Sequence, residues 1–146
     1  MATVESLIAQ VRQRYWENWQ EELLPAPTAD IEQLCDWVEE RFGAPVPVDL
    51  IAFWRLADGC GMNGMSLDSP LEVLETTELY VDQYPEYLMI GSYEDGPMYT
   101  YNMVARQFQT LEQFNFEEGP RAVYADFVDL LEMAVGVMFG EEWNEW

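Results

Sequence analysis

The sequence predicts a single α+β domain, in which N-terminal helices precede a mostly antiparallel sheet and a C-terminal helix packs on that sheet. Three observations predict this class. The chain has 146 residues, which suits one domain; apolar residues recur with helical period near both ends; and apolar and polar residues alternate, as in strands, between them. Helices, then strands, then a helix is the order expected of an α+β fold with helices on one side of the sheet. No internal repeat interrupts it, so residues 1–146 are expected to form one domain.

The first helix is expected over residues 4–23, because its apolar residues, beginning with Val4, are spaced by three and four. The segment LPAPT then ends the helix, since its two prolines lack amide donors and hold the chain extended. Residues 1–27 are therefore predicted to be an N-terminal helix with a proline-rich connector. A second helix should follow Thr28, a good N-cap residue, and end before Gly43.

A shorter helix is expected over residues 48–57, with Pro47 near its first turn. The next segment, GMSLDSPLEVLE, mixes apolar and polar residues in approximate alternation, which predicts the first strand. The segment YLMIGSYEDGPMYTYNM predicts two strands with one covered face, joined by a turn at residues 94–97, and RQFQTLEQFNF predicts another strand. Helical periodicity over residues 124–138 predicts the last helix, and residues 140–146 form an acidic tail that contains tryptophan.

Composition excludes most common enzyme designs. The chain has no histidine and no lysine, and its six basic side chains are all arginine. Without histidine, neither a Ser-His-Asp triad nor a His-ligated zinc or haem site can be built. Without lysine, neither a Schiff base nor a P-loop lysine is possible. The two cysteines, Cys35 and Cys60, form no C-x-x-C motif, so we expect no metal and no cofactor.

The charge balance predicts what kind of partner the protein attracts. Its formal net charge is −22, and no basic side chain occurs between residues 56 and 105. Nucleic-acid binding depends on clustered lysine and arginine, so we expect no nucleic-acid partner. An acidic surface attracts a basic partner instead. A hydrophobic content of 49% with 14% aromatic residues still predicts a folded core, with properties that depend on ionic strength.

The cellular location is predicted from two further features. The first residues, MATVESLIAQVRQRYW, have no basic segment followed by an apolar core, so no signal peptide is expected. The longest apolar run, MAVGVMF, is too short to span a bilayer. We therefore expect a cytoplasmic protein with no membrane partner, and its oligomeric state stays open.

The stretch ADGCGMNGMSL, residues 57–67, contains the written form of the dinucleotide-binding fingerprint G-x-G-x-x-G. That fingerprint requires a strand before the glycines and a helix after them. Here a helix is predicted before the glycines and a strand after them, and the neighbouring acids would repel a pyrophosphate. The glycines therefore predict a helix end and a turn. The same stretch also lacks the ligand spacing of an EF-hand.

Four segments carry a resemblance to a known family. They are IEQLCDWVEERFGAPVPVDLIAFWRLADG, MNGMSL, LMIGSYEDGPMYTYNM and YADFVDLLEMA, which together span most of the chain. They are similar to the SUKH superfamily, the group that includes the cell-wall assembly regulator and Syd domains, and within it to the YrhA-like branch. Val46-Pro47 stands where this family more often has leucine-proline. The resemblance implies a non-enzymatic α+β domain with no shared catalytic residues.

The resemblance also implies a role in immunity. Bacterial members often bind and neutralise the toxin domain of a polymorphic or contact-dependent system inside the producing cell. The acidic charge of this chain agrees with a basic toxin, such as a nuclease, which it would attract rapidly. Two other functions stay open. One is a regulatory adaptor for a cellular protein; the other is a carboxylate-based hydrolase that pairs Asp68 with Glu94, or Glu94 with Asp95.

We expect the partner-binding surface to include acids and tyrosines near the predicted strands. Acids from Glu72 to Glu86 recur at intervals of three and four, so they would crowd one face if that segment were helical. Tyrosines beside carboxylates suit a protein interface. Trp143 and Trp146 either fold back onto the core or anchor a partner. The predicted partner-binding residues are Asp68, Glu72, Glu75, Glu78, Glu94, Asp95, Tyr99 and Tyr101.

Overall fold

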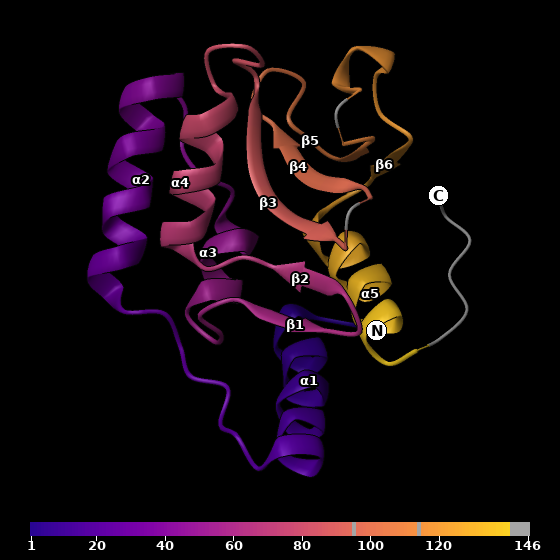
Figure 1. The fold of residues 1–146 in the computed structure, drawn as a ribbon. Helices are drawn as coiled ribbons and strands as arrows, with labels where there is room; N and C mark the ends of the chain where they lie inside the picture. The colour runs from indigo at the N-terminus through magenta and orange to yellow at the C-terminus, as the bar shows by residue number, and fades with distance from the viewer. Residues whose placement is uncertain (95, 114, 141–146) are drawn as a thin grey trace.

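The computed structural model describes residues 1–94, 96–113 and 115–140. These residues form one α+β domain, as predicted (Figure 1). Its helices are α1 (Val4–Trp19), α2 (Thr28–Phe42), α3 (Val48–Trp54), α4 (Pro70–Tyr80), the 3-10 helix η1 (Phe116–Glu118) and α5 (Phe127–Met138). Its strands are β1 (Cys60–Met62), β2 (Met65–Leu67), β3 (Tyr87–Tyr93), β4 (Met98–Asn102), β5 (Gln107–Leu111) and β6 (Ala122–Tyr124). The strands form one antiparallel sheet in sequence order, from β1 to β6.

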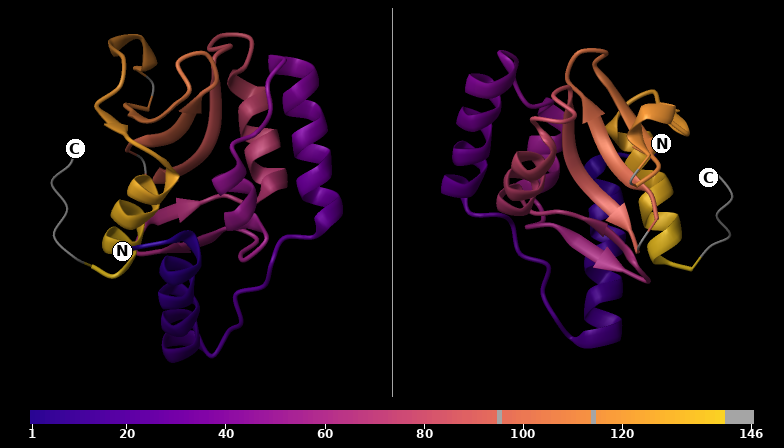
Figure 2. Two further views of the ribbon diagram at one scale, coloured as in Figure 1. Left: turned by 180° about the vertical axis from the view of Figure 1, so that it is seen from behind. Right: turned by 45° about the horizontal axis from the view of Figure 1, so that its top comes forward.

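The helices surround the sheet at three places. α2 and α4 lie side by side next to β3, while α5 lies at the other side of the molecule, beside β2 and β6 (Figures 1 and 2). α1 packs against α3 and α5 and extends below β1. The rings of Phe53 and Phe108 lie 5.7 and 5.4 Å from the ring of Phe127. These contacts join α3, the sheet and α5 into one main core.

Both faces of the central strands are covered, whereas the sequence predicted one covered face. Side chains alternate along a strand, so Leu88 and Ile90 enter the main core while Tyr87 and Met89 point to the opposite face. There they form a second apolar cluster, which Phe116 of η1 joins. The prediction was wrong because a non-local segment covers that face, and the period of the strands alone does not show it.

The segment GMSLDSPLEVLE is a strand only over β2, and its second half belongs to α4. The helix begins with a capping box, in which Ser69 and Glu72 exchange hydrogen bonds between side chains and backbone amides. Pro70 follows at the first helical position. An amide at this position has no acceptor within the helix, so proline's lack of an N–H group costs no helical hydrogen bond. The prediction of a strand was therefore wrong beyond β2. The apolar residues of α4 show only weak helical periodicity, and the capping box with Pro70 determines that a helix forms there.

α4 takes the place that a longer β2 would occupy beside β3. The amide of Met89 lies beyond the end of β2, and it donates to Thr77 Oγ1 at 3.0 Å. Met89 and Thr77 are both fully buried. The hydroxyl group thus satisfies a backbone donor that water does not reach, and it joins α4 to the sheet.

Replacing Thr77 by valine should therefore destabilise the protein by about 1–3 kcal/mol, because the isosteric side chain leaves the buried amide of Met89 without an acceptor. Urea unfolding measures the effect. The matched control is Thr76→Val on the same helix, because Thr76 is half-buried and its hydroxyl forms no hydrogen bond within the described residues. Equal free energies of unfolding for the two variants would contradict this role of Thr77.

The glycine motif forms the β1–β2 hairpin. Asn63 and Gly64 both have positive φ, 54° and 82°, as a tight two-residue hairpin turn requires. The outer edge of β1 is occupied as well: the amide of Gly61 donates to the Tyr15 hydroxyl at 2.7 Å, and that hydroxyl donates to the Gly61 carbonyl at 2.9 Å. The order is helix, strand, turn, strand, which differs from the strand, glycines and helix of a dinucleotide site. The Asn-Gly pair closes the hairpin between β1 and β2.

Several helix ends differ from those predicted. α1 ends at Trp19 and not near residue 23, although Leu23 is still buried in the connector. Pro27, not Thr28, precedes α2, and it provides no side-chain cap. α3 ends at Trp54, before residue 57. α5 begins at Phe127, because residues 122–124 extend the sheet as β6. Residues 141–146, with Trp143 and Trp146, lie outside the described part of the chain.

Candidate functional site

The most distinctive surface is built by two helices that run in the same direction. At their C-terminal ends, Arg41 of α2 lies 3.3 Å from Asp82, which follows α4. At their N-terminal ends lies Asp58. Burial is the main cause that raises the pKa of Asp58, and the nearby charges of Asp30 and Glu72 raise it further. The two helices therefore align like ends, as Figure 1 shows.

We call the carboxylates of these two helices the acidic surface. They lie on the sides of the helices opposite the buried positions of Ile31, Leu34, Val38 and Val73. Arg41 is the one cation on α2 and α4, and its charge is engaged by Asp82. The acidic surface comprises Asp30, Glu32, Asp36, Glu39 and Glu40 of α2 together with Glu72, Glu75 and Glu78 of α4.

Helix dipoles explain part of how so many like charges are tolerated. The parallel arrangement brings two positive N-terminal ends together where Asp30, Asp58 and Glu72 gather. Glu72 is also held by the capping box at the start of α4. Farther along α4, Glu75 and Glu78 have no such compensation, and each like-charge pair in a helix costs about 0.2–0.5 kcal/mol. A basic partner would relieve that repulsion.

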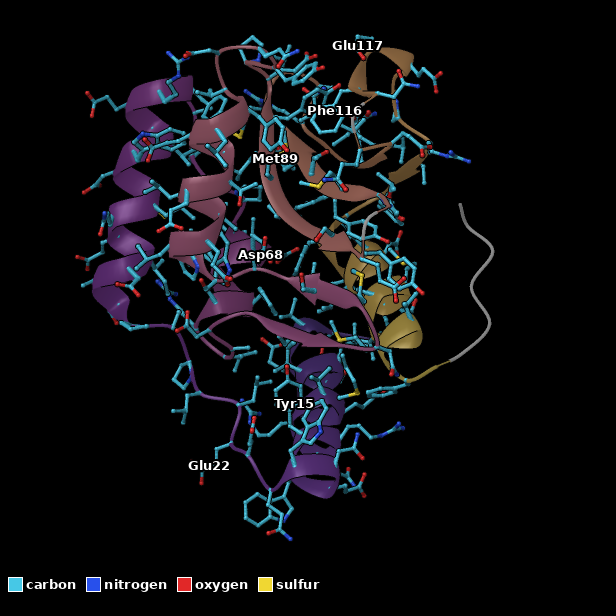
Figure 3. All side chains as sticks on the ribbon, viewed as in Figure 1. Tyr15, Glu22, Asp68, Met89, Phe116 and Glu117 are labelled. Carbon is cyan, nitrogen blue, oxygen red and sulfur yellow. The ribbon has the colours of Figure 1, made fainter. Side chains whose placement is uncertain are left out.

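Asp68 is the most perturbed carboxyl group near this surface. Burial, reinforced by the charge of Glu72, raises its pKa to about 6, although a hydrogen bond from the Ser66 hydroxyl at 3.2 Å opposes the shift. Its backbone carbonyl accepts a bond from Trp54 Nε1 at 2.9 Å. Figure 3 places Asp68 at the lower end of α4. The residue therefore has a mainly structural setting between the core and the acidic surface.

Replacing Asp68 by asparagine should stabilise the protein at pH 7.5 by on the order of 2–3 kcal/mol. The folded state binds the proton of Asp68 more tightly than the unfolded chain does, whose aspartate pKa is about 3.9. Stability from this group is therefore fully present below about pH 4 and is lost as the pH rises through about 6. Asparagine keeps the shape and the acceptor for Ser66 but carries no charge.

Urea unfolding between pH 4 and 8 measures this effect. Glu75→Gln removes one exposed charge from the adjacent helix and reports the contribution of net charge alone. We expect the wild type and Glu75→Gln to lose stability across this range, and Asp68→Asn to lose clearly less. Parallel pH profiles for all three proteins would contradict the assignment to Asp68.

The β3–β4 hairpin holds the remaining predicted site residues, and one of them is not at the surface. Tyr99 is fully buried in the main core, so its predicted role as a surface contributor was wrong. Its place on a strand with two covered faces explains the error. Tyr101 is half-buried against Phe108, with ring centroids 4.7 Å apart. Glu94 is exposed, next to Gly64, and Asp95 lies outside the described residues.

The acid pair considered for a hydrolase is not brought together. Asp68 follows the end of β2, where its amide donates to the carbonyl of Ile90. Glu94 lies beside Gly64, at the other end of the same strand, where its amide donates to the Gly64 carbonyl. Four residues of extended chain separate the two positions by roughly 13 Å. The carboxyl groups of glycosidases act from about 5 to 9.5 Å apart.

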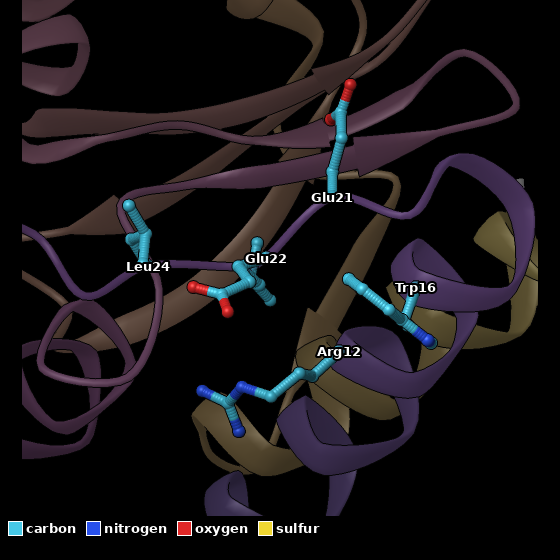
Figure 4. Close-up of a pocket in the computed structure, with 6 residues that line it drawn as sticks. Arg12, Trp16, Glu21, Glu22 and Leu24 are labelled. Carbon is cyan, nitrogen blue, oxygen red and sulfur yellow. The ribbon is translucent and has the colours of Figure 1, made fainter.

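A shallow groove lies between α1 and the connector. Arg12 and Trp16 of α1 face Glu22 and Leu24 across it, while the carboxylate of Glu21 points away from Arg12 (Figure 4). The guanidinium group of Arg12 donates to the Leu56 carbonyl at 3.0 Å. Trp16 is 57% exposed and Leu24 is 61% exposed. The groove therefore presents exposed apolar side chains beside a guanidinium group that Leu56 already engages.

The acids of α2 were not among the predicted site residues. The sequence contains their signal, because Glu32, Asp36, Glu39 and Glu40 fall between the apolar positions of a helix. The sequence does not show that α2 packs beside α4 and aligns with it. That contact links segments separated by the whole of α3 and the first hairpin.

The described part of the chain shows neither a membrane-spanning helix nor a cluster of metal ligands. In the described part of the chain, no helix has the length and apolar character needed to cross a membrane. No three histidine, cysteine or acidic side chains among those residues gather in a way that could hold a metal ion.

Comparisons with known proteins identify no family for this chain. A scan against protein-family models finds no match, and no curated protein is detectably similar in sequence.

Proposed function

We propose that this protein is a non-enzymatic immunity protein, which binds the basic toxin domain of a bacterial polymorphic or contact-dependent system and neutralises it. The acidic surface of α2 and α4 carries the proposal. It joins carboxylates from two aligned helices, and the one cation on those helices is already paired with Asp82. The resemblance of four segments to the SUKH superfamily supports the same function and stays a prediction.

The proposed mechanism is stoichiometric. The net charge of −22 accelerates encounter with a basic protein through long-range attraction, which falls with rising ionic strength. On docking, the acidic surface pairs with basic side chains of the toxin and covers its active site or substrate groove. The repulsion among Glu75, Glu78 and their neighbours is then replaced by favourable pairs. No bond is made or broken, and the protein acts inside the producing cell.

Co-expression tests this function. The protein encoded immediately upstream of this chain is expressed in a bacterial host, alone and together with this protein. We expect growth arrest in the first case and normal growth in the second, with a 1:1 complex recovered from the cells. A non-toxic neighbour that still forms the complex would favour the regulatory adaptor. Toxicity without rescue and without a complex would refute the immunity function.

A further inference from the structure

We propose that the hollow between α4 and η1 is an aromatic pocket that binds an arginine side chain of the partner protein. The hollow measures about 230 Å³ and is lined by Tyr80, Gln83, Tyr84, Phe116 and Glu117. None of these residues belongs to the predicted site. The assignment of this arginine to a partner protein rests on the proposed function. The binding of a guanidinium group in the pocket does not depend on that function.

Three rings form the apolar part of this aromatic pocket. Phe116 is buried at its floor, and the ring centroids of Tyr84 and Tyr80 lie 4.6 and 5.8 Å from that of Phe116. The two tyrosines are only half-buried, so their rings remain accessible from the hollow. Aromatic faces attract a cation placed within about 6 Å of the ring centroid. The rings of Tyr80 and Tyr84 therefore offer faces on which a guanidinium group can stack.

A carboxylate completes the aromatic pocket. Tyr84 donates its hydroxyl to Glu117 Oε1 at 2.9 Å, and Gln83 donates to the same hydroxyl at 3.3 Å. This hydrogen bond to Glu117 is the main cause that raises the pKa of Tyr84, so the tyrosine hydroxyl stays protonated and donates. In the described part of the chain, no arginine forms an ion pair with Glu117. Its position is thus fixed by Tyr84 while its charge is left for a ligand.

The place of the aromatic pocket identifies its occupant. Tyr80 ends α4, so the pocket lies at the C-terminal end of a helix that carries part of the acidic surface. Figure 3 places Glu117 at the outer rim of the molecule with Phe116 below it. A basic protein docked along α4 would present cations there. Arginine fits better than lysine, because its planar guanidinium stacks on a ring and also forks to a carboxylate.

Nuclear magnetic resonance titration with Nα-acetyl-arginine amide tests the aromatic pocket without any toxin. We expect saturable shifts of the ring resonances of Tyr80, Tyr84 and Phe116, and upfield shifts of the side-chain protons of the probe, which stacking on a ring produces. The isosteric and uncharged Nα-acetyl-citrulline amide should produce neither at the same concentrations. Because no partner is needed, this result is independent of the co-expression test.

Two neighbouring variants separate the pocket from general charge attraction. Glu117→Gln should weaken binding of the arginine probe about fivefold, whereas Glu118→Gln, with the same change of net charge, should leave the affinity within about 1.5-fold. Both positions are exposed, so both variants should fold. Equal weakening by the two variants, equal shifts with the citrulline probe, or shifts confined to α2 would each overturn the proposal.

Discussion

Reversing the charges of Glu75 and Glu78 to lysine should slow association with the basic partner by at least about tenfold at low salt. The two residues are about one helical turn apart on the exposed side of α4, within the acidic surface. Four units of charge change there would replace long-range attraction with local repulsion. Stopped-flow or surface-based kinetics at about 20 mM and 200 mM salt measure the rates, and the difference should shrink as salt screens the charges.

The matched control is Asp129→Lys with Glu132→Lys on α5. These two acids have the same spacing and exposure, and α5 lies at the other side of the molecule from α2 (Figure 1). The control changes the net charge by the same amount, so it should slow association only slightly. Equal slowing by both double variants would mean that net charge matters and the place of the acidic surface does not. An unchanged rate with the α4 variant would remove Glu75 and Glu78 from the interface.

Replacing Gly91 by alanine should destabilise the protein by about 3 kcal/mol, a loss large enough to be a major fraction of its total stability. A Cβ atom at Gly91 would lie 2.4 Å from the Ser66 carbonyl oxygen and 3.1 Å from Leu67 Cδ2. The obstacle is backbone of the neighbouring strand β2, which cannot turn aside as a flexible side chain could. Gly91 pairs with Leu67 of β2, which brings the glycine against that strand.

Thermal or urea unfolding of Gly91→Ala measures the effect, with Ser92→Ala as the control on the next residue of β3. The control should change the free energy of unfolding by no more than about 0.5 kcal/mol. In Gly91→Ala we expect the β1–β2 hairpin to separate from β3. Amide exchange of Asp68 and Glu94 should then increase, because these amides donate to the carbonyls of Ile90 and Gly64 between β3 and the hairpin. Native-like stability would show that β2 moves to accommodate the methyl group and would contradict the close approach.

Local signals in the sequence predicted most of this fold. The apolar stripe of α2 and the periodicity of α5 each lie within one segment, and both helices form there, although α5 begins three residues later than predicted. β3 and β4 form on either side of the predicted turn. α4 was predicted incorrectly because alternation over a few residues resembles helical spacing. Its capping box of Ser69 and Glu72 was the better signal. The short strands β1 and β6 gain their identity only from pairing with β2 and β5.

The candidate site was harder to predict, because it depends on contacts between distant segments. Exposure of Glu75 and Glu78 follows from helical spacing, so it could be expected once α4 was recognised. Burial of Tyr99 and of Phe116 depends on what covers each face of the sheet. The aromatic pocket joins residues that precede β3 in the sequence with residues that follow β5. Tyr84 and Glu117 are 33 positions apart.

We propose that this protein inhibits a basic toxin by binding it one to one, without catalysis. Light scattering on a mixture of the purified protein and its purified upstream-encoded partner, combined with a titration of the partner's toxic activity, tests it most directly. We expect a complex with the mass of one copy of each chain and complete inhibition at one equivalent. Absence of a complex, or complete inhibition at a small fraction of an equivalent, would contradict it.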